Sequence, residues 1–444
     1  MKSKNYSYNP LITEIIGICL LFLISRLLIL FVLPIWYSDI PYYATIAEYA
    51  SIANDRGLYL NDIKTFEYPP LAAFLLEIPN SFINENLIST STYRSLYNYY
   101  FRLTIFLFDC IAFTFVLLSA FHLYPNNSAK IFRVATIYII STLILFNLAY
   151  DRLDLLLMCF MLACYYFQIK QNYIISAIFL SLGIFLKLIP VLFIPLWLMG
   201  WCLTVKYKVK QFIAVKNWNY AIKALISLLI SSLVLTLISI YFYGPDVFDF
   251  LIYHTNRGIQ IESVPSTLIQ IANWIGIPYY IDNSYGSQNI VSSITPILST
   301  LSPFLILLGM TVVLIKLIQN KKIRICFTKP FCVKHPEILN VAYISSFMAI
   351  FICSKVLSTQ FFLLPIPFIA IFLSNKNIHF SILWITILVL TTFIFPYLYF
   401  TDIVPISRSW YENPSLLGTS LMLIRNFLLI YLFFYFVKKI KLSE

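Results

Sequence analysis

Twelve long apolar stretches run along the chain, separated by polar segments of which two are long. The stretches are continuously apolar rather than alternating, and about 20 apolar residues in a helix cross the hydrocarbon core of a bilayer. The pattern therefore predicts an all-α polytopic membrane protein, a single transmembrane domain over residues 1–444. The expected helices cover roughly residues 11–35, 99–123, 130–148, 153–169, 172–187, 188–205, 220–243, 290–318, 338–354, 360–375, 378–400 and 416–437.

The two long segments between apolar stretches, 36–98 and 244–289, contain too many apolar residues to be unstructured linkers. Alanine and isoleucine recur at helical spacing between Ala44 and Ala53, which predicts an amphipathic helix at the membrane surface. A second short interfacial helix is expected over 71–78, because Pro69 and Pro70 suit a first helical turn.

Composition excludes a soluble domain, since 60% of the residues are hydrophobic and only 11% are charged. The net charge of +12 raises the alternative of nucleic-acid binding. However, the basic residues occupy short loops between apolar stretches, which is the positive-inside pattern of membrane proteins. We therefore expect membrane lipids as partners and no nucleic acid.

The same rule predicts the orientation in the plasma membrane. With the N-terminus inside, the inner segments hold Lys2, Lys4, Lys130, Lys170, Lys206, Lys208, Lys210, Lys216, Lys321, Lys322, Arg324, Lys329, Lys334, Lys376, Lys438, Lys439 and Lys441. The outer segments hold most acids: Asp39, Glu48, Asp55, Asp62, Glu67, Glu85, Asp246, Asp249, Glu262, Asp282, Asp402 and Glu412. Both termini are thus expected in the cytoplasm and both long loops outside.

Several kinds of site have no sequence signal. The eight cysteines, at positions 19, 110, 159, 164, 202, 326, 332 and 353, lack metal-binding spacing and are interpreted as packing residues. There is no Walker or GxGxxG motif for a nucleotide, and no HExxH motif for a metal. No cleavable signal peptide is expected, because the first apolar run is too long and lacks a cleavage site.

The unusual polar residues gather at the predicted outer ends of the helices. Asp39 follows the first helix among aromatic residues, where an ionised carboxylate is costly without a role or a partner. One interpretation is a general base that accepts a proton from a sugar hydroxyl. The other is a cap for the helix that follows.

Two further groups admit a structural and a functional interpretation. Glu67 and Tyr68 precede the tandem prolines and either shape a site or belong to an ordinary loop-to-helix turn. Asp151, Arg152 and Asp154 open the fourth helix. They either form a charged cavity wall or place acids at a helix N-terminus, where the macrodipole stabilises them.

Lys187 interrupts an apolar run, and intramembrane lysines usually face a cavity or an anion, although snorkelling to the surface is the alternative. Lys355 lies between two apolar stretches on the side opposite to the topological lysines. His254, Arg257, Gln260 and Glu262 crowd into one outer loop. Arg is suited to bidentate phosphate binding, and Glu262 could orient it or contact a sugar hydroxyl.

The order of these motifs resembles the GT-C membrane glycosyltransferases over essentially the whole chain, and most closely glycosyltransferase family 87. The motifs that carry the resemblance are Ser38-Asp39, Glu67-Tyr68-Pro69-Pro70-Leu71, Asp151-Arg152-Leu153-Asp154, Lys187-Leu188-Ile189-Pro190, His254 to Ser263, Lys355 to Gln360 and Arg425-Asn426. The catalytic subunit of GPI mannosyltransferase I shows a similar but more distant pattern, with an acidic pair near the position of Asp39, where this chain has Pro41 two residues on.

The resemblance implies a GT-C fold and an inverting transfer of a hexose, with mannose the family default, from a polyprenyl-phosphate sugar to a lipid or glycan acceptor. Asp39, in the first outer loop (36–98), matches the family's catalytic base. His254, Arg257, Gln260, Glu262, Lys355 and Lys187 would bind the donor, with the loop 244–289 in its site. Glu67, Tyr68, Asp151, Arg152 and Asp154 would line the acceptor side or the cavity. The resemblance also implies that no metal is needed and that there is no cofactor, the lipid-linked sugar being the donor substrate.

A membrane transporter or flippase of a lipid-linked sugar is the main alternative. Transporters place charged residues near the bilayer midplane and are often built from repeats. Here the charges lie at helix ends and in outer loops, and no repeat is evident.

Overall fold

The computed structural model describes residues 10–33, 37–63, 66–83, 89–202, 219–320, 330–375, 378–407, 410–411 and 413–442. Most of the described chain is helical, and helices form in all twelve apolar stretches. The basic segments 203–218 and 321–329, Cys326, Lys376, Glu85 and Glu412 lie outside the described residues. The side of the membrane on which the charges at those positions lie therefore stays a prediction.

Seven helices of the described chain are long and apolar enough to cross a membrane. They fall within α1 (Pro10–Phe31), α5 (Thr90–Leu123), α11 (Asn219–Tyr243), α14 (Thr295–Gln319), α16 (Pro336–Cys353), α18 (Ile378–Thr392) with the wide turn that follows it, and α19 (Leu416–Leu442). The protein is thus a polytopic helical membrane protein, and the finer count of twelve spans stays a prediction.

The other apolar helices are shorter. They are α6 (Ser128–Ile144), α7 (Phe146–Ala149), α8 (Asp154–Ile169), α9 (Tyr173–Leu186), the 3-10 turn η2 (Ile189–Phe193) with α10 (Ile194–Trp201), and the 3-10 turn η5 (Thr359–Leu363) with α17 (Ile366–Leu373). The run 172–205 is divided where the sequence indicated, because Lys187 is extended (φ −154°, ψ 148°) and ends α9. A short helix α15 (Phe331–Lys334) precedes α16.

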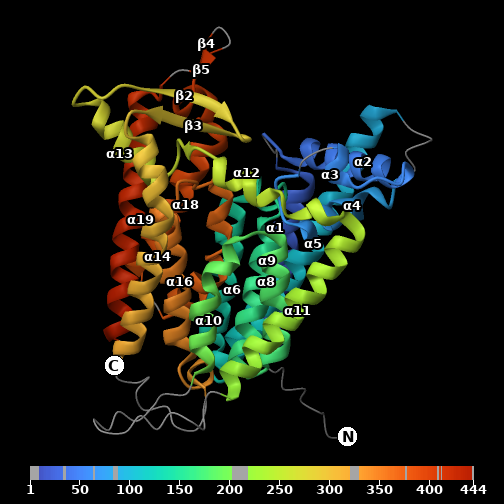
Figure 1. The fold of residues 1–444 in the computed structure, drawn as a ribbon. Coiled ribbons are helices and arrows are strands. Elements are labelled where there is room, and N and C mark those ends of the chain that lie inside the picture. The colour runs from blue at the N-terminus through green and yellow to red at the C-terminus, as the bar shows by residue number, and fades with distance from the viewer. Residues whose placement is uncertain are drawn as a thin grey trace, which may run out of the picture.

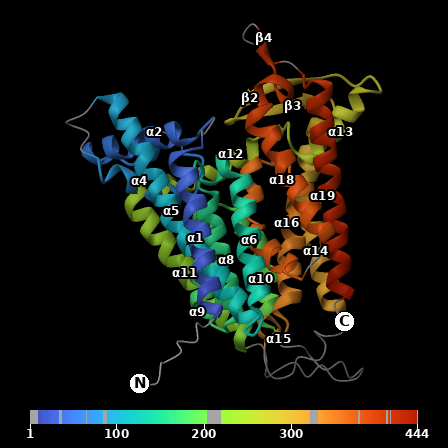
Figure 2. The same cartoon turned by 180° about the vertical axis from the view of Figure 1, so that it is seen from behind.

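Both short helices expected in the first long loop are present. They are α2 (Ile40–Asp55) and α4 (Pro70–Asn80), with the single turn α3 (Leu60–Ile63) between them. Pro70 occupies the first turn of α4, where a missing N–H costs nothing. Figure 1 shows α2, α3 and α4 together at one end of the bundle, and Figure 2 shows α2 and α4 there from behind.

The second long loop contains strands that the helical prediction did not include. The turn η3 (Pro245–Phe248) and α12 (Phe250–Asn256) lead to β1 (Ile259–Gln260), α13 (Val264–Asn273), β2 (Tyr279–Ser284) and β3 (Ser287–Ser292). The strands form an antiparallel sheet in the order β1-β3-β2. Tyr285 and Gly286 join β2 to β3 with positive φ angles of 52° and 64°, as a two-residue hairpin turn requires. The predicted helix 290–318 therefore begins only at Thr295.

The sheet and α2–α4 lie at the same end of the bundle, over different helices, with α12 between them (Figures 1 and 2). A second small core, which includes Ile261, Ile290, Tyr399 and Met422, joins the sheet to the wide turns η6 (Phe393–Tyr397) and η7 (Tyr399–Ile403) and to α19. These turns replace the last part of the predicted helix 378–400. Two antiparallel strands of two residues each, β4 (Ile406–Ser407) and β5 (Trp410–Tyr411), extend beyond them.

Candidate functional site

A cavity of about 1280 Å³ is lined by residues of α12 and β3 and of the segments that precede α2 and α4, among others. This volume exceeds the ~300–1,000 Å³ of common small-molecule pockets, so it is large enough for two substrate groups at once. The predicted site residues that line it are Asp39, Glu67, Tyr68, Arg152, Lys187, His254, Arg257, Gln260, Glu262 and Lys355. Six separate segments of the chain therefore converge where their order in the sequence suggested.

Asp39 immediately precedes α2, and its carboxylate forms an ion pair with Arg152. The Asp39 side chain is 34% exposed, whereas that of Arg152 is 9% exposed. Arg152 lies in the turn between α7 and α8 and also donates through Nη2 to the carbonyl of Tyr37 (3.2 Å). A guanidinium beside a carboxylate stabilises the ionised form, which is the form that accepts a proton.

Asp151 and Asp154 lie behind the cavity wall and do not line it. Arg102 on α5 donates to Asp151 at 3.0 Å, and Lys187 Nζ lies 2.7 Å from Asp154 Oδ2. Both carboxylates are fully buried, so each is drawn to a cation on another helix rather than to the cavity. The two acids and Arg152 therefore belong to three separate ion pairs.

Lys187 reaches the cavity from the end of α9. Besides Asp154, it contacts the faces of two aromatic rings, with Nζ 5.3 Å from the Tyr68 centroid and 5.5 Å from that of Phe361. Aromatic faces and a carboxylate together satisfy the charge of a buried ammonium. The ion pair accounts for Lys187 without a phosphate, and its role in donor binding stays a prediction.

Arg257 and Lys355 are the cavity's cations that lack an ion pair among the described residues, where no carboxylate oxygen lies within 4.0 Å of either. Arg257 Nε donates to Ser287 Oγ at 3.4 Å, and Lys355 Nζ donates to the carbonyl of Thr255 at 3.1 Å. Burial and then the nearby Arg257 lower the pKa of Lys355. Two cations that repel each other and have no counter-charge favour binding of an anion.

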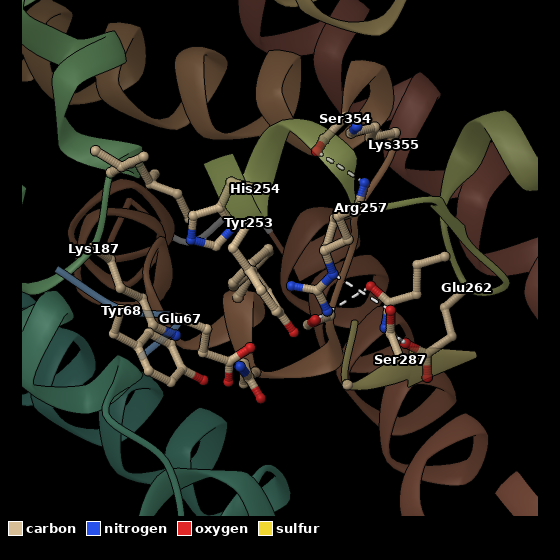
Figure 3. A pocket seen from close by; sticks show the side chains of 18 of the residues that line it. Glu67, Tyr68, Lys187, Tyr253, His254, Arg257, Glu262, Ser287, Ser354 and Lys355 are labelled. Atoms are coloured by element: carbon tan, nitrogen blue, oxygen red, sulfur yellow. Dashed lines mark hydrogen bonds between the residues drawn. The ribbon is translucent and has the colours of Figure 1, made fainter. Parts of the chain in front are cut away.

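His254, on α12, faces the same part of the cavity (Figure 3). Burial and then the charge of Arg257 lower the pKa of His254 to about 4, so it is neutral near pH 7. The neighbouring Tyr253 points toward Glu67 (Figure 3), and burial and then the charge of Glu67 raise the pKa of Tyr253. A neutral His254 can accept or donate a hydrogen bond to an uncharged ligand group.

Gln260 and Glu262 form a hydrogen-bonded pair beside the sheet. Gln260 Nε2 donates to Glu262 Oε2 (2.9 Å), and Ser358 Oγ donates to Gln260 Oε1 (3.2 Å). Glu262 is 2% exposed, and its Oε1 has no partner among the described residues. Burial raises the pKa of Glu262 to about 7, against the opposing charges of Arg425, Arg152 and Arg257.

Some residues around the cavity were not identified from sequence. Tyr37, Phe395, Tyr399 and Phe400 line it beside Asp39. The signal that could have found three of them was Pro396, which breaks the apolar run 378–400. A fully buried network was also missed, although its Arg26 and Asp109 are charges inside apolar stretches, where charges usually have a partner.

Comparisons with known proteins leave the family open. No family model matches the chain, and no curated protein matches it. Within the described residues, no three His, Cys, Asp or Glu side chains gather as metal ligands would.

Proposed function

We propose that the protein is an integral membrane glycosyltransferase of the plasma membrane, with its active site on the outer face and both termini in the cytoplasm. It transfers a hexose, expected to be mannose, from a polyprenyl-phosphate sugar to a glycolipid or glycan acceptor. One observation carries the proposal: the Asp39 carboxylate lines the same cavity as Arg257 and Lys355. These two residues are cations without an ion pair among the described residues.

The proposed reaction is a single inverting displacement. The acceptor oxygen forms a bond to the anomeric carbon of the donor while the bond from that carbon to the phosphate oxygen breaks. The acceptor's proton passes to Asp39, and the bonding electron pair leaves on the phosphate. Arg257 and Lys355 stabilise the charge that grows on this leaving group, because fixed cations in a partly dry site interact strongly with it.

The remaining residues suit recognition of the sugar. Gln260 and Glu262 offer amide and carboxylate groups to hydroxyls, and the unpartnered Glu262 Oε1 accepts one without losing an existing bond. His254 is neutral near pH 7 and adds a further hydrogen-bonding group. Glu67 and Tyr68 line the cavity on the α4 side, which we assign to the acceptor.

A transporter or flippase of a lipid-linked sugar would bind the same donor. Its charged residues would be expected near the middle of the membrane. Most of the cavity's charged residues instead belong to α12, to the residues that flank the first strand of the sheet and to the segments that precede α2 and α4, which lie at one end of the bundle (Figure 1). This placement favours chemistry at a surface over passage through the protein.

The deciding experiment uses purified protein in nanodiscs, radiolabelled polyprenyl-phosphate mannose and a lipid extract of the host as acceptor. We expect wild type to transfer label. The transfer rate of Asp39→Asn should be lower by at least about 100-fold, the lower end of the range for removal of a general base. Asp55→Asn is the matched control. Asp39 immediately precedes α2, whereas Asp55 is the last residue of α2, is exposed and does not line the cavity.

Each other outcome is informative. Equal transfer by wild type and Asp39→Asn would remove Asp39 from the mechanism. The protein would be a flippase, and not an enzyme, if two results came together. It would transfer no sugar from any of a panel of lipid-phosphate sugars, and it would move the intact donor across vesicle membranes.

A further inference from the structure

Four aromatic side chains form a continuous wall of the cavity beside Asp39. They are Tyr37, Phe395, Tyr399 and Phe400, named here the aromatic wall. The Tyr37 ring lies 4.7 Å from Phe400 and 6.3 Å from Phe395, between centroids. Tyr399 lies 5.1 Å from Phe395 and 5.0 Å from Phe400, so each ring contacts at least two others.

Polar groups frame this wall. Arg152 Cζ lies 5.8 Å from the Phe395 centroid, and the same guanidinium pairs with Asp39. On the far side, the Tyr399 hydroxyl donates to Gln288 Oε1 at 2.6 Å. An aromatic surface with a carboxylate, a guanidinium and an amide at its edges is suited to a ligand that is apolar on one face and rich in hydroxyls at its rim.

Two observations indicate that the wall has an unfilled ligand position. Arg152 Nε is buried and has no partner among the described residues, although Arg152 lines the cavity. Tyr37 is 50% exposed, and its backbone has a φ angle of 55°. A non-glycine residue in the left-handed region is uncommon, and such residues cluster at ligand sites.

We propose that the aromatic wall binds a pyranose ring of the glycolipid or glycan acceptor and so forms the sugar subsite of that acceptor. The C–H face of the sugar lies on Tyr37 and Phe400, because these hydrogens carry partial positive charge and the ring faces are negative. The hydroxyls at the rim then reach Asp39 and Arg152. This inference rests on the proposed function only in assigning the bound sugar to the acceptor.

The donor's lipid chain is a poorer occupant of this wall. A hydrocarbon chain would exclude water from Asp39, Arg152 and Gln288 without offering hydrogen bonds, and burying polar groups in this way is costly. A sugar ring covers the aromatic faces and still supplies hydrogen bonds to these groups.

The test measures sugar binding without turnover. Saturation-transfer difference NMR is recorded on the full chain in nanodiscs with methyl α-glycosides of mannose, glucose, galactose and N-acetylglucosamine, and empty nanodiscs give the background. At least one glycoside should receive saturation at its ring protons. Tyr37→Leu and Phe400→Leu, which keep apolar volume but remove the π face, should weaken its binding about threefold to tenfold.

Phe393→Leu is the matched control, because Phe393 is 50% exposed and lies in the same segment but does not line the cavity. It should bind as wild type does. Absence of ring-proton saturation for every glycoside, or equal binding by wild type and both wall variants, would overturn the inference. Loss of polyprenyl-phosphate binding in the wall variants, with glycoside binding intact, would also overturn it and assign the wall to the donor lipid.

The outcome is separable from that of the proposed function. If the protein transfers no sugar but binds a glycoside on this wall, the site exists and the enzymatic assignment fails. If it transfers label and the wall variants keep the wild-type KM for acceptor, the enzyme stands and this inference fails.

Discussion

Lys187 and Asp154 form a buried ion pair, with Nζ 2.7 Å from Oδ2, that joins the end of α9 to the start of α8. Asp154 is fully buried and its Oδ1 has no partner among the described residues, so the lysine is its main source of neutralisation. Arg152, which pairs with Asp39, lies two residues before Asp154 in the turn that leads into α8. The pair therefore stabilises the part of the chain that holds the proposed base.

We expect Lys187→Met to lower thermal stability strongly, because it leaves a carboxylate buried without its cation. Breaking such a pair costs about 3–5 kcal/mol in proteins where it has been measured. The double variant Lys187→Met/Asp154→Leu should regain much of the loss, since it removes both charges. The check is the unfolding temperature of the three proteins in one detergent. An unchanged unfolding temperature with a raised donor KM would instead assign Lys187 to the donor phosphate.

Arg257→Ala and Lys355→Ala should weaken donor binding with little effect on stability, because neither cation has an ion pair to lose among the described residues. A hydrogen bond to a charged group is worth about 1.5–3 kcal/mol, so kcat/KM for the donor should fall roughly 10-fold to 100-fold. The measurement is initial rate against polyprenyl-phosphate sugar concentration. Lys130→Ala is the control, because Lys130 lies at the start of α6, does not line the cavity and bonds to Asn375 instead. A similar effect in the control would show that overall charge, and not this site, attracts the donor.

The apolar runs predicted where helices form, because helix length and continuous hydrophobicity are local properties of the sequence. They also indicated which polar residues would meet, since charges at successive outer helix ends share one surface. Asp39, Arg257 and Lys355 line one cavity for this reason.

The pairing of those charges was not predictable. Arg152 contacts Asp39, while its neighbours Asp151 and Asp154 select Arg102 and Lys187. Which cation pairs with which carboxylate depends on how the helices rotate and pack against one another. The local sequence around each residue does not determine that packing. The hairpin β2–β3 was likewise absorbed into a predicted loop and helix, because Ile290 and Val291 continue into the apolar run of α14.

Removal of divalent metals should leave transfer unchanged, as the resemblance to family 87 implies. The test is treatment of the purified protein with EDTA, followed by the transfer assay with and without added Mg²⁺ or Mn²⁺. A parallel metal-dependent glycosyltransferase shows that the chelation is complete. Loss of activity that returns with one metal would contradict the prediction and would direct attention to the carboxylates of the cavity.

Glu262 should make stability depend on pH in a defined direction. Burial raises its pKa from 4.5 to about 7 in the folded protein. Between these pH values the folded state binds more protons than the unfolded state, so the stability contributed by the protonated Glu262 is lost as pH rises. Glu262→Gln keeps the shape and has no such titration. The unfolding temperature of wild type minus that of Glu262→Gln should therefore fall as pH rises from about 4.5 to about 7, and then level off.

The comparison within one pair of proteins removes a competing effect. The pKa of His254 is lowered to about 4, and its titration acts oppositely, because stability then rises with pH from about 4 to about 6.5. His254 is present in both proteins, so its contribution cancels in the difference. A difference that stays flat over this range would show that Glu262 binds protons equally in the folded and unfolded states, with a folded pKa near 4.5. The Arg425 and Arg152 charges would then offset the effect of burial, and Glu262 would be an anion in the site at neutral pH.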